Sequence, residues 1–181
     1  MDAQRCILTR RSVRQFADRP VSRELLEKVV SLASYAPSWK NTQISRYIAI
    51  EDPATRETIA SEYCLPGANN PTIIRACPLL VAQTFVKARS GYERDGSFTT
   101  DREAGWQYYD CGIAAQTFCL AAHELGLGTV IMGIFDWKRL QAYLEVPEDQ
   151  ELMALIAVGW PGGAELTAPK RKDVDILLSY R

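Results

Sequence analysis

Residues 79–85 read LLVAQTF, an almost unbroken apolar run. A strand with one face in water alternates apolar and polar residues, whereas a strand covered on both faces stays apolar along its length. Because residues 79–85 follow the second pattern, we expect them to form the central strand of a sheet with structure packed on both sides.

Shorter apolar segments on either side predict three more strands, at residues 47–50, 129–132 and 154–158. Helices are predicted before and between them. Four of these helices begin at a residue whose side chain can accept from free backbone N–H groups: Asp2, Ser22, Asp52 and Asp136. No repeat, low-complexity tract or linker divides the chain. The sequence therefore predicts one α+β or α/β domain over residues 1–181, with a small sheet among helices.

The longest predicted helix covers residues 101–125 and ends at Gly126. Alanine and leucine are dense in it and charges are few on any face, so we expect a helix buried nearly all round. The polar segment before it, residues 91–100, contains two glycines and is predicted to be a surface loop. Whether that loop covers a site is left open by the sequence.

Composition and charge exclude several classes of protein. The chain has 181 residues, 47% hydrophobic and 24% charged, and a formal net charge of -1, which does not favour nucleic acid as a partner. Neither a signal peptide nor a membrane-spanning apolar run is visible. Five cysteines without a CxxC pair and a single histidine favour reduced thiols over disulfides or zinc, so a cytoplasmic protein without a metal is expected.

Two polar clusters are candidates for ligand binding. Residues 10–14, Arg-Arg-Ser-Val-Arg, place three guanidinium groups and a hydroxyl in one turn, as a phosphate cradle requires, although a solvated basic turn has the same composition. Residues 36–43 concentrate amides and hydroxyls that either bind a polar ligand or cap turns. A second basic group, residues 170–172, is far away in sequence but free to meet the first one in space.

Two other features do not predict chemistry. Gly126-Leu127-Gly128 ends a helix and enters a strand, the reverse of the order in a dinucleotide-binding fingerprint. His123 lies in the last turn of the same helix without a serine or cysteine elbow, so a structural histidine is favoured over a catalytic one.

The chain resembles the nitroreductase family from Ile7 to Leu178. The blocks that carry the resemblance occur in the family's order: Arg10 to Phe16 with Pro20-Val21, Ala36-Pro37-Ser38 with Asn41 and Gln43, Gly112 to Ala122, Leu125 to Thr129, and Val158 to Pro161. Two departures from the family pattern are a bulky Trp39 where small residues are frequent, and Ile44-Ser45 after Gln43 where proline and an aromatic residue are common.

The resemblance implies an α+β fold, with a central, mainly antiparallel sheet flanked by helices, and a homodimer whose subunits meet at the long helix. Each of two FMN sites would draw on both subunits. The resemblance implies which residues bind FMN. At the phosphate and ribityl chain they are Arg10, Arg11, Ser12, Arg14, Lys170 and Arg171. The partner subunit would supply Pro37, Ser38, Trp39, Asn41 and Gln43, Met132 and Gly133 would lie along the isoalloxazine, and Asn70 is a further FMN-binding candidate.

The resemblance also implies an activity. NADH or NADPH would reduce the flavin, and a nitroaromatic, a quinone or another electron-poor acceptor would then be reduced in a ping-pong cycle. No catalytic side chain is expected, because the flavin carries the chemistry. The same scaffold supports dehalogenation, heterocycle dehydrogenation and flavin fragmentation, and a non-catalytic FMN-binding or storage protein is a further alternative.

Overall fold

The computed structural model describes residues 1–164 and 166–181. Its centre is an antiparallel four-stranded sheet with the order β1-β2-β4-β3. The strands are β1 (Ser45–Ile50), β2 (Leu79–Val86), β3 (Gly128–Met132) and β4 (Gln150–Gly159). Strand β2 lies between β1 and β4, and residues 79–85 are all buried, which confirms the central position that its apolar run predicts.

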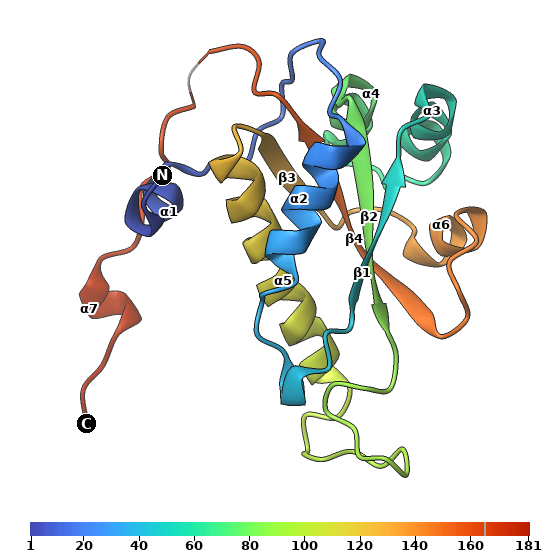
Figure 1. Ribbon diagram of the computed structural model, residues 1–181, viewed down its shortest axis with the longest axis vertical. Helices are drawn as coiled ribbons and strands as arrows, with labels where there is room; N and C mark the ends of the chain where they lie inside the picture. The colour runs from blue at the N-terminus through green and yellow to red at the C-terminus, as the bar shows by residue number, and fades with distance from the viewer. Residues whose placement is uncertain (165) are drawn as a thin grey trace.

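Helices cover both faces of this sheet (Figure 1). On one face lie α2 (Arg23–Ala33) and α5 (Gly105–Glu124); on the other lie α3 (Pro53–Glu62), α4 (Asn70–Ala76) and α6 (Trp137–Tyr143). The short α1 (Ala3–Thr9) packs beside α5, and α7 (Val174–Leu177) lies near the C-terminus. The predicted α+β class, with an antiparallel sheet flanked by helices, is therefore confirmed.

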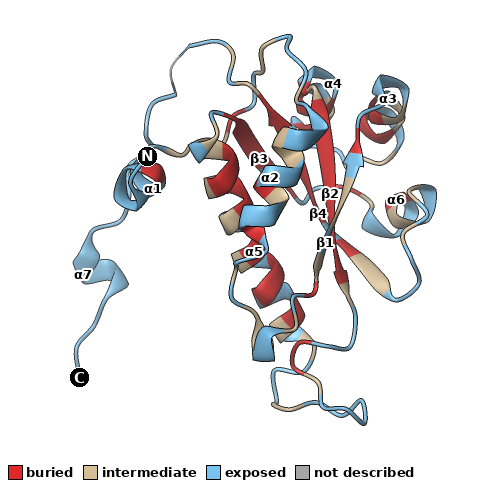
Figure 2. Ribbon diagram, viewed as in Figure 1, coloured by how far each residue is buried: buried red, intermediate tan, exposed pale blue. Residues whose placement is uncertain are grey.

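Each face of the sheet has its own hydrophobic core, because successive side chains of a strand point to opposite faces. Leu80 and Ala82 of β2 pack with residues of α3, α4 and α6. Leu79 and Val81 pack on the other face, against α2 and α5. Figure 2 shows the resulting burial, concentrated along the central strands and the sheet-facing side of α5.

The predicted helix starts are confirmed by hydrogen bonds. Each capping side chain accepts from a backbone N–H three residues later, and the four acceptors are Asp2, Ser22, Asp52 and Asp136. These helices begin where they do because a side-chain oxygen satisfies a backbone donor that the first helical turn leaves without a partner.

The long helix differs from the prediction in two respects. It begins at Gly105 rather than near residue 101, and it is not buried nearly all round. Tyr109 is 62% exposed, and Gly112 and Gln116 continue the exposed stripe at helical spacing. One chain therefore covers the sheet-facing side of α5 and leaves an opposite, weakly polar stripe uncovered.

A second difference is helix α4, which begins at Asn70, where the Asn-Pro sequence indicates a break. Pro71 falls in the first turn of α4, where a missing N–H costs no intrahelical hydrogen bond. Beyond residue 165 the chain forms an arm that leaves the body and carries α7 (Figure 1). In the described part of the chain, no helix is long and apolar enough to cross a membrane.

Candidate functional site

The basic N-terminal segment is held against the edge of the sheet. Val13 donates its backbone N–H to the carbonyl of Thr129 at 2.9 Å, and Ala17 donates to Trp160 at 2.9 Å. Gly128 permits this close approach, because a Cβ at that position would lie 2.6 Å from Val13 Cγ2. The glycine that enters β3 thus has a packing role, in agreement with rejection of a dinucleotide fingerprint.

Two of the predicted phosphate ligands line a cavity of about 550 Å³. It is lined by Ser12 and Arg14, by Asn69 and Thr72 at the start of α4, and by Gly162, Ala164, Leu166 and Thr167. The cavity therefore brings together three parts of the chain that are far apart in sequence. The sequence did not predict Asn69 and Thr72 as site residues. Their only signal in the sequence is that they lie next to the candidate Asn70.

The charge of this region is uncompensated. Among the described residues, no carboxylate lies within ion-pair distance of Arg10, Arg11 or Arg14. Arg11 donates from Nη1 to the carbonyls of Leu8 at 2.7 Å and Arg10 at 2.8 Å, while its buried Nε has no partner. Three unpaired guanidinium groups make this region an attractive position for an anion.

The positive charges of Arg10 and Arg11 also affect His123. It lies at the end of α5, where its Nε2 forms a 2.8 Å hydrogen bond with the hydroxyl of Thr9. Burial lowers the pKa of His123, and the charges of Arg10 and Arg11 lower it further. This placement fits the structural histidine that the sequence favours.

The predicted partner-facing loop, residues 36–43, has an unusual backbone. Lys40, Asn41 and Gln43 have φ values of 46°, 57° and 48°, a left-handed region that non-glycine residues rarely adopt. The hydroxyl of Ser38 accepts from the backbone N–H of Gln43 at 2.9 Å, which closes the loop. The side chains of Asn41 and Gln43 are exposed, and Gln43 Nε2 donates to Asn41 Oδ1 at 3.1 Å.

The structure explains both departures from the family pattern in this loop. Ile44 is buried, in contact with Phe85 and Cys111, so its side chain points into the core. Trp39 packs on Trp106, with ring centroids 4.8 Å apart. Neither bulky side chain is therefore free to reach out from the loop.

One subunit does not bring the loop and the basic cradle together. The loop contacts Asp110 near the start of α5, whereas Ser12 pairs with Thr129 beyond the end of this helix. At 1.5 Å per residue, the helix between Asp110 and Glu124 separates the two groups by about 20 Å. Figure 1 shows them toward opposite ends of α5.

The remaining candidates lie in three places. Asn70 is buried and its Nδ2 donates to the carbonyl of Ile134 at 3.2 Å, which ties α4 to the segment after β3. Met132 is buried in the core, whereas Gly133 is exposed and a Cβ there would meet nothing within 4 Å. Lys170 and Arg171 lie on the arm, exposed, and Arg171 contacts the carbonyl of Pro169.

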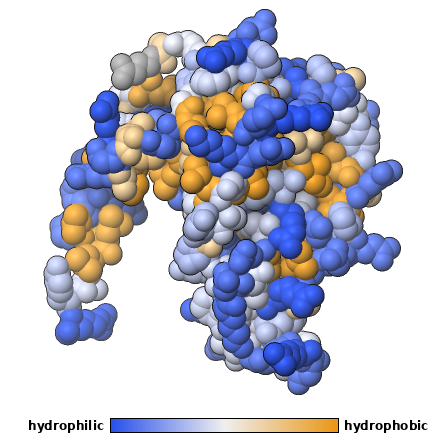
Figure 3. All heavy atoms as spheres, viewed as in Figure 1, coloured by the Kyte–Doolittle hydropathy of each residue, from blue (hydrophilic) through white to orange (hydrophobic). Residues whose placement is uncertain are grey.

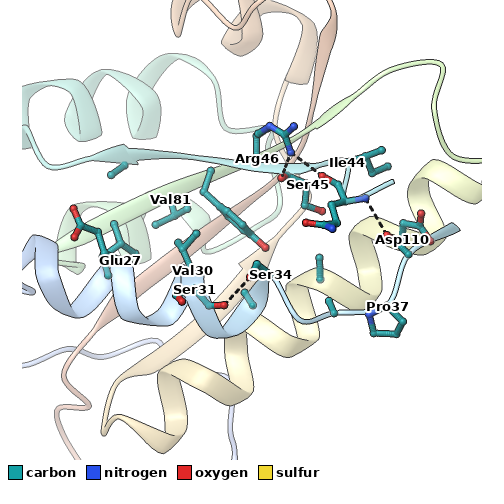
Figure 4. A pocket seen from close by; sticks show the side chains of 18 residues that line it. Glu27, Val30, Ser31, Ser34, Pro37, Ile44, Ser45, Arg46, Val81 and Asp110 are labelled. Atoms are coloured by element: carbon teal, nitrogen blue, oxygen red, sulfur yellow. Dashed lines mark hydrogen bonds between the residues drawn. The ribbon is translucent and has the colours of Figure 1, made fainter. Parts of the chain in front are cut away.

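A second cavity, of about 590 Å³, lies between α2 and β1 (Figure 4). Val30, Val81 and Ala114 contribute apolar side chains to it, and Arg46 lies at the β1 side. Tyr47 also lines this cavity; its hydroxyl is buried and has no hydrogen-bond partner among the described residues, and burial raises the pKa of Tyr47. The edge strand β1 and this apolar cavity thus form a surface that a single chain leaves uncovered.

Fold and site together define an α+β protein with an uncompensated basic cavity at one end of its sheet. The family model described as the nitroreductase family matches residues 7–160. The chain belongs to the nitroreductase family.

Relatives and solved structures agree with this assignment. A protein of Archaeoglobus fulgidus, provisionally named an NADH dehydrogenase/NAD(P)H nitroreductase, is 29% identical over 163 residues, 86% of this chain and 83% of the relative. An FMN reductase [NAD(P)H] of Bacillus subtilis is 29% identical over 168 residues, 88% of this chain and 66% of the relative. The structure of a Desulfovibrio desulfuricans protein in complex with FMN has a TM-score of 0.79, at 24% identity, and covers 100% of this chain and 98% of that one.

Proposed function

We propose that this protein is an FMN-dependent oxidoreductase that takes electrons from NADH or NADPH and passes them to nitroaromatics, quinones or similar electron-poor acceptors. The observation that carries the proposal is the cavity lined by Ser12 and Arg14, which follow Arg10 and Arg11 in sequence; among the described residues, none of these three arginines has a carboxylate partner. The names of the relatives, an NAD(P)H nitroreductase and an FMN reductase, support the same chemistry.

The residues present fit the phosphate end of FMN. A phosphomonoester carries close to two negative charges, and guanidinium and hydroxyl groups are suitable donors for its oxygens. Arg10, Ser12 and Arg14 would hold the phosphate and ribityl chain, with Arg11 beside them. Arg171 would approach from the arm, since Thr167, four residues before it, already lines the cavity.

The protein contributes binding and orientation, because the flavin, when bound, supplies the hydride chemistry. Gly133 leaves open space at the end of β3, against which a flat ring can lie. Asn70 holds the neighbouring segment through its bond to Ile134 and keeps its amide oxygen for a ligand. We assign no side chain of this protein a role as general acid or general base.

A second copy of the chain would complete the site. The 36–43 loop of one subunit lies too far from its own basic cradle, so we propose that it contacts the flavin held by the partner. A homodimer would also cover the exposed stripe of α5 and the arm. The arm exposes the side chains of Val174, Ile176, Leu177, Leu178 and Tyr180, and Figure 3 shows hydrophobic residues gathered there. Surfaces of this kind are typical of subunit interfaces.

The deciding experiment is a visible absorption spectrum of the purified protein reconstituted with FMN, followed by anaerobic additions of NADH and NADPH. Loss of the oxidised flavin band would support the oxidoreductase and identify its donor. Reoxidation by a nitroaromatic or a quinone would then identify the acceptor class. A stable yellow spectrum with both donors would refute NAD(P)H-dependent turnover, and a protein that takes up no FMN would refute the cofactor.

A further inference from the structure

Asp110 is a buried carboxylate for which the proposed activity has no direct use. It lies on α5 with 4% of its surface exposed, in a helix that is otherwise nearly free of acidic residues. One oxygen, Oδ2, accepts both the backbone N–H of Trp39 at 2.9 Å and the hydroxyl of Ser90 at 2.5 Å. A buried carboxylate oxygen with two donors forms a strong and costly contact, so its position in the core requires an explanation.

The contacts of Asp110 converge on the 36–43 loop. Ser90, which donates to Asp110, also shares a 2.7 Å hydrogen bond with the hydroxyl of Thr42. The carboxylate therefore reaches the loop twice, directly at Trp39 and through Ser90 at Thr42. The two contact points lie on either side of the residues with positive φ, Lys40 and Asn41.

Positive φ at non-glycine residues costs free energy and persists only where surrounding contacts enforce it. Three such residues, Lys40, Asn41 and Gln43, lie within four positions of one another. The exposed ion pair between Lys40 and Glu93 contributes little. Within the loop, the Ser38 hydroxyl holds Gln43. Asp110 is the buried acceptor that ties the loop to α5 on both sides of Lys40 and Asn41, and it helps to offset their strain.

We propose that Asp110 is a positioning residue that holds the 36–43 loop, in its strained conformation, for contact with the flavin of the partner subunit. This inference rests on the proposed function. Asp110 touches neither flavin nor substrate. It acts through the backbone of Trp39 and, by way of Ser90, through Thr42, and so presents Asn41 and Gln43 to the other subunit in one conformation.

The test compares Asp110→Leu with Gln107→Leu. Gln107 is a matched control because it lies one turn earlier on α5, is also 4% exposed, and accepts from the backbone N–H of Ala88 at 2.7 Å. Ala88 also has a positive φ, of 54°, and lies outside the 36–43 loop, two residues before Ser90. Both variants lose one buried acceptor, but Asp110→Leu leaves two donors without a partner and Gln107→Leu leaves one. FMN affinities are therefore compared well below the Tm of both variants, where a difference between them reports on the loop.

We expect Asp110→Leu to weaken FMN binding by about 10-fold or more, measured by quenching of flavin fluorescence, with Gln107→Leu close to the wild type. Asp110→Asn should restore most of the affinity, because its amide oxygen can accept both donors. Ser90→Ala, which removes only the indirect contact, should give a smaller loss in the same direction, and it carries the test if Asp110→Leu does not fold.

A second readout does not depend on flavin. Trp39 and Trp106 lie 4.8 Å apart, so their coupled circular dichroism reports the loop position in the apoprotein, and Trp39→Phe identifies that signal. Asp110→Leu should lose the signal and Gln107→Leu should keep it. Wild-type affinity in Asp110→Leu, or an equal loss in Gln107→Leu, would overturn the positioning role alone. A wild-type protein that binds no FMN would overturn the proposed function and this inference with it.

Discussion

Arg14 shows how a single residue can be assigned a role by the absence of a partner. Arg23, for comparison, forms an ion pair with Glu51 at 2.7 Å. Arg14 instead contacts the backbone carbonyl of Ser12 at 3.1 Å and lines the basic cavity. A charged donor without a counter-charge, beside a cavity, is available to an anionic ligand.

Replacing Arg14 by alanine should weaken FMN binding by about 1.5–3 kcal/mol, roughly 10- to 100-fold, because a charge-assisted contact with phosphate is lost. Flavin fluorescence titration measures this effect. Arg23→Ala, which removes an arginine distant from the cavity, is the control and should bind FMN normally. Equal affinity of the two variants would exclude Arg14 from the phosphate site.

The cysteines provide a second prediction at this scale. Burial raises the pKa of Cys77 to about 11 and that of Cys111 to about 12, and Cys6 and Cys119 are also buried. Cys64 is half-buried. Because thiolate fraction and access control reactivity, a thiol reagent at pH 8 should modify Cys64 first in the native protein.

Mass spectrometry after brief alkylation identifies the modified residue. All five cysteines should react after denaturation. Cys64→Ser should remove the fast native reaction, and fast labelling of Cys77 or Cys111 in that variant would contradict the buried environments described above.

At the scale of the element, the sequence predicted the four capped helix starts well. It predicted the packing of distant elements poorly. The caps at Asp2, Ser22, Asp52 and Asp136 are confirmed because a cap involves neighbouring residues only. Helix α4 and the exposed stripe of α5 were not predicted. Pro71 indicates a break as readily as a first turn, and an apolar helix does not reveal which side meets its own sheet.

The cap at Asp52 gives a pH-dependent prediction. A hydrogen bond from the Thr55 hydroxyl, supported by the backbone N–H groups of Thr55 and Ala54, lowers the pKa of Asp52 below its ordinary value of 3.8. The folded-state pKa is thus lower than the unfolded one. Its contribution to stability is present above pH 3.8 and is lost as the pH falls through the lowered value.

Asp52→Ala should therefore lower the Tm at pH 7, and the difference from the wild type should shrink below pH 3.8. Thermal unfolding at several pH values measures it. Asp52→Asn keeps a capping oxygen without a titrating group, so its Tm should lie closer to the wild type at pH 7. A difference independent of pH in Asp52→Ala would assign the effect to the cap geometry alone.

At the scale of the whole molecule, one chain leaves several apolar or weakly polar surfaces exposed. The arm beyond residue 165, the stripe of α5 and the edge strand β1 with its apolar cavity are all uncovered. The separation of about 20 Å along α5 between the basic cradle and the 36–43 loop adds a functional reason for a second subunit. Dimerisation would satisfy both requirements.

If the arm is part of the interface of the proposed homodimer, the double variant Ile176→Asp with Leu177→Asp should be a monomer, because two exposed apolar side chains of the arm become charged. Light scattering after size exclusion measures the mass. FMN binding should weaken in parallel, since the partner's loop is lost. Lys138→Asp, which changes an exposed residue of α6, is the control and should remain dimeric; a dimeric double variant would exclude the arm from the interface.

The inner position of β2 could be predicted from the residues, and the family with its antiparallel sheet from the resemblance. The phosphate role of the arginine cluster at residues 10–14 stays a prediction. Apolar periodicity, capping residues and a run of arginines are local patterns, which depend only on residues close together in the sequence. The tertiary structure alone decided that Asn69 and Thr72 join Ser12 at one cavity, that Asp110 holds the 36–43 loop, and that this loop lies far from its own cradle. Those relations depend on how distant segments pack, and the packing is determined by the close fit of the whole core.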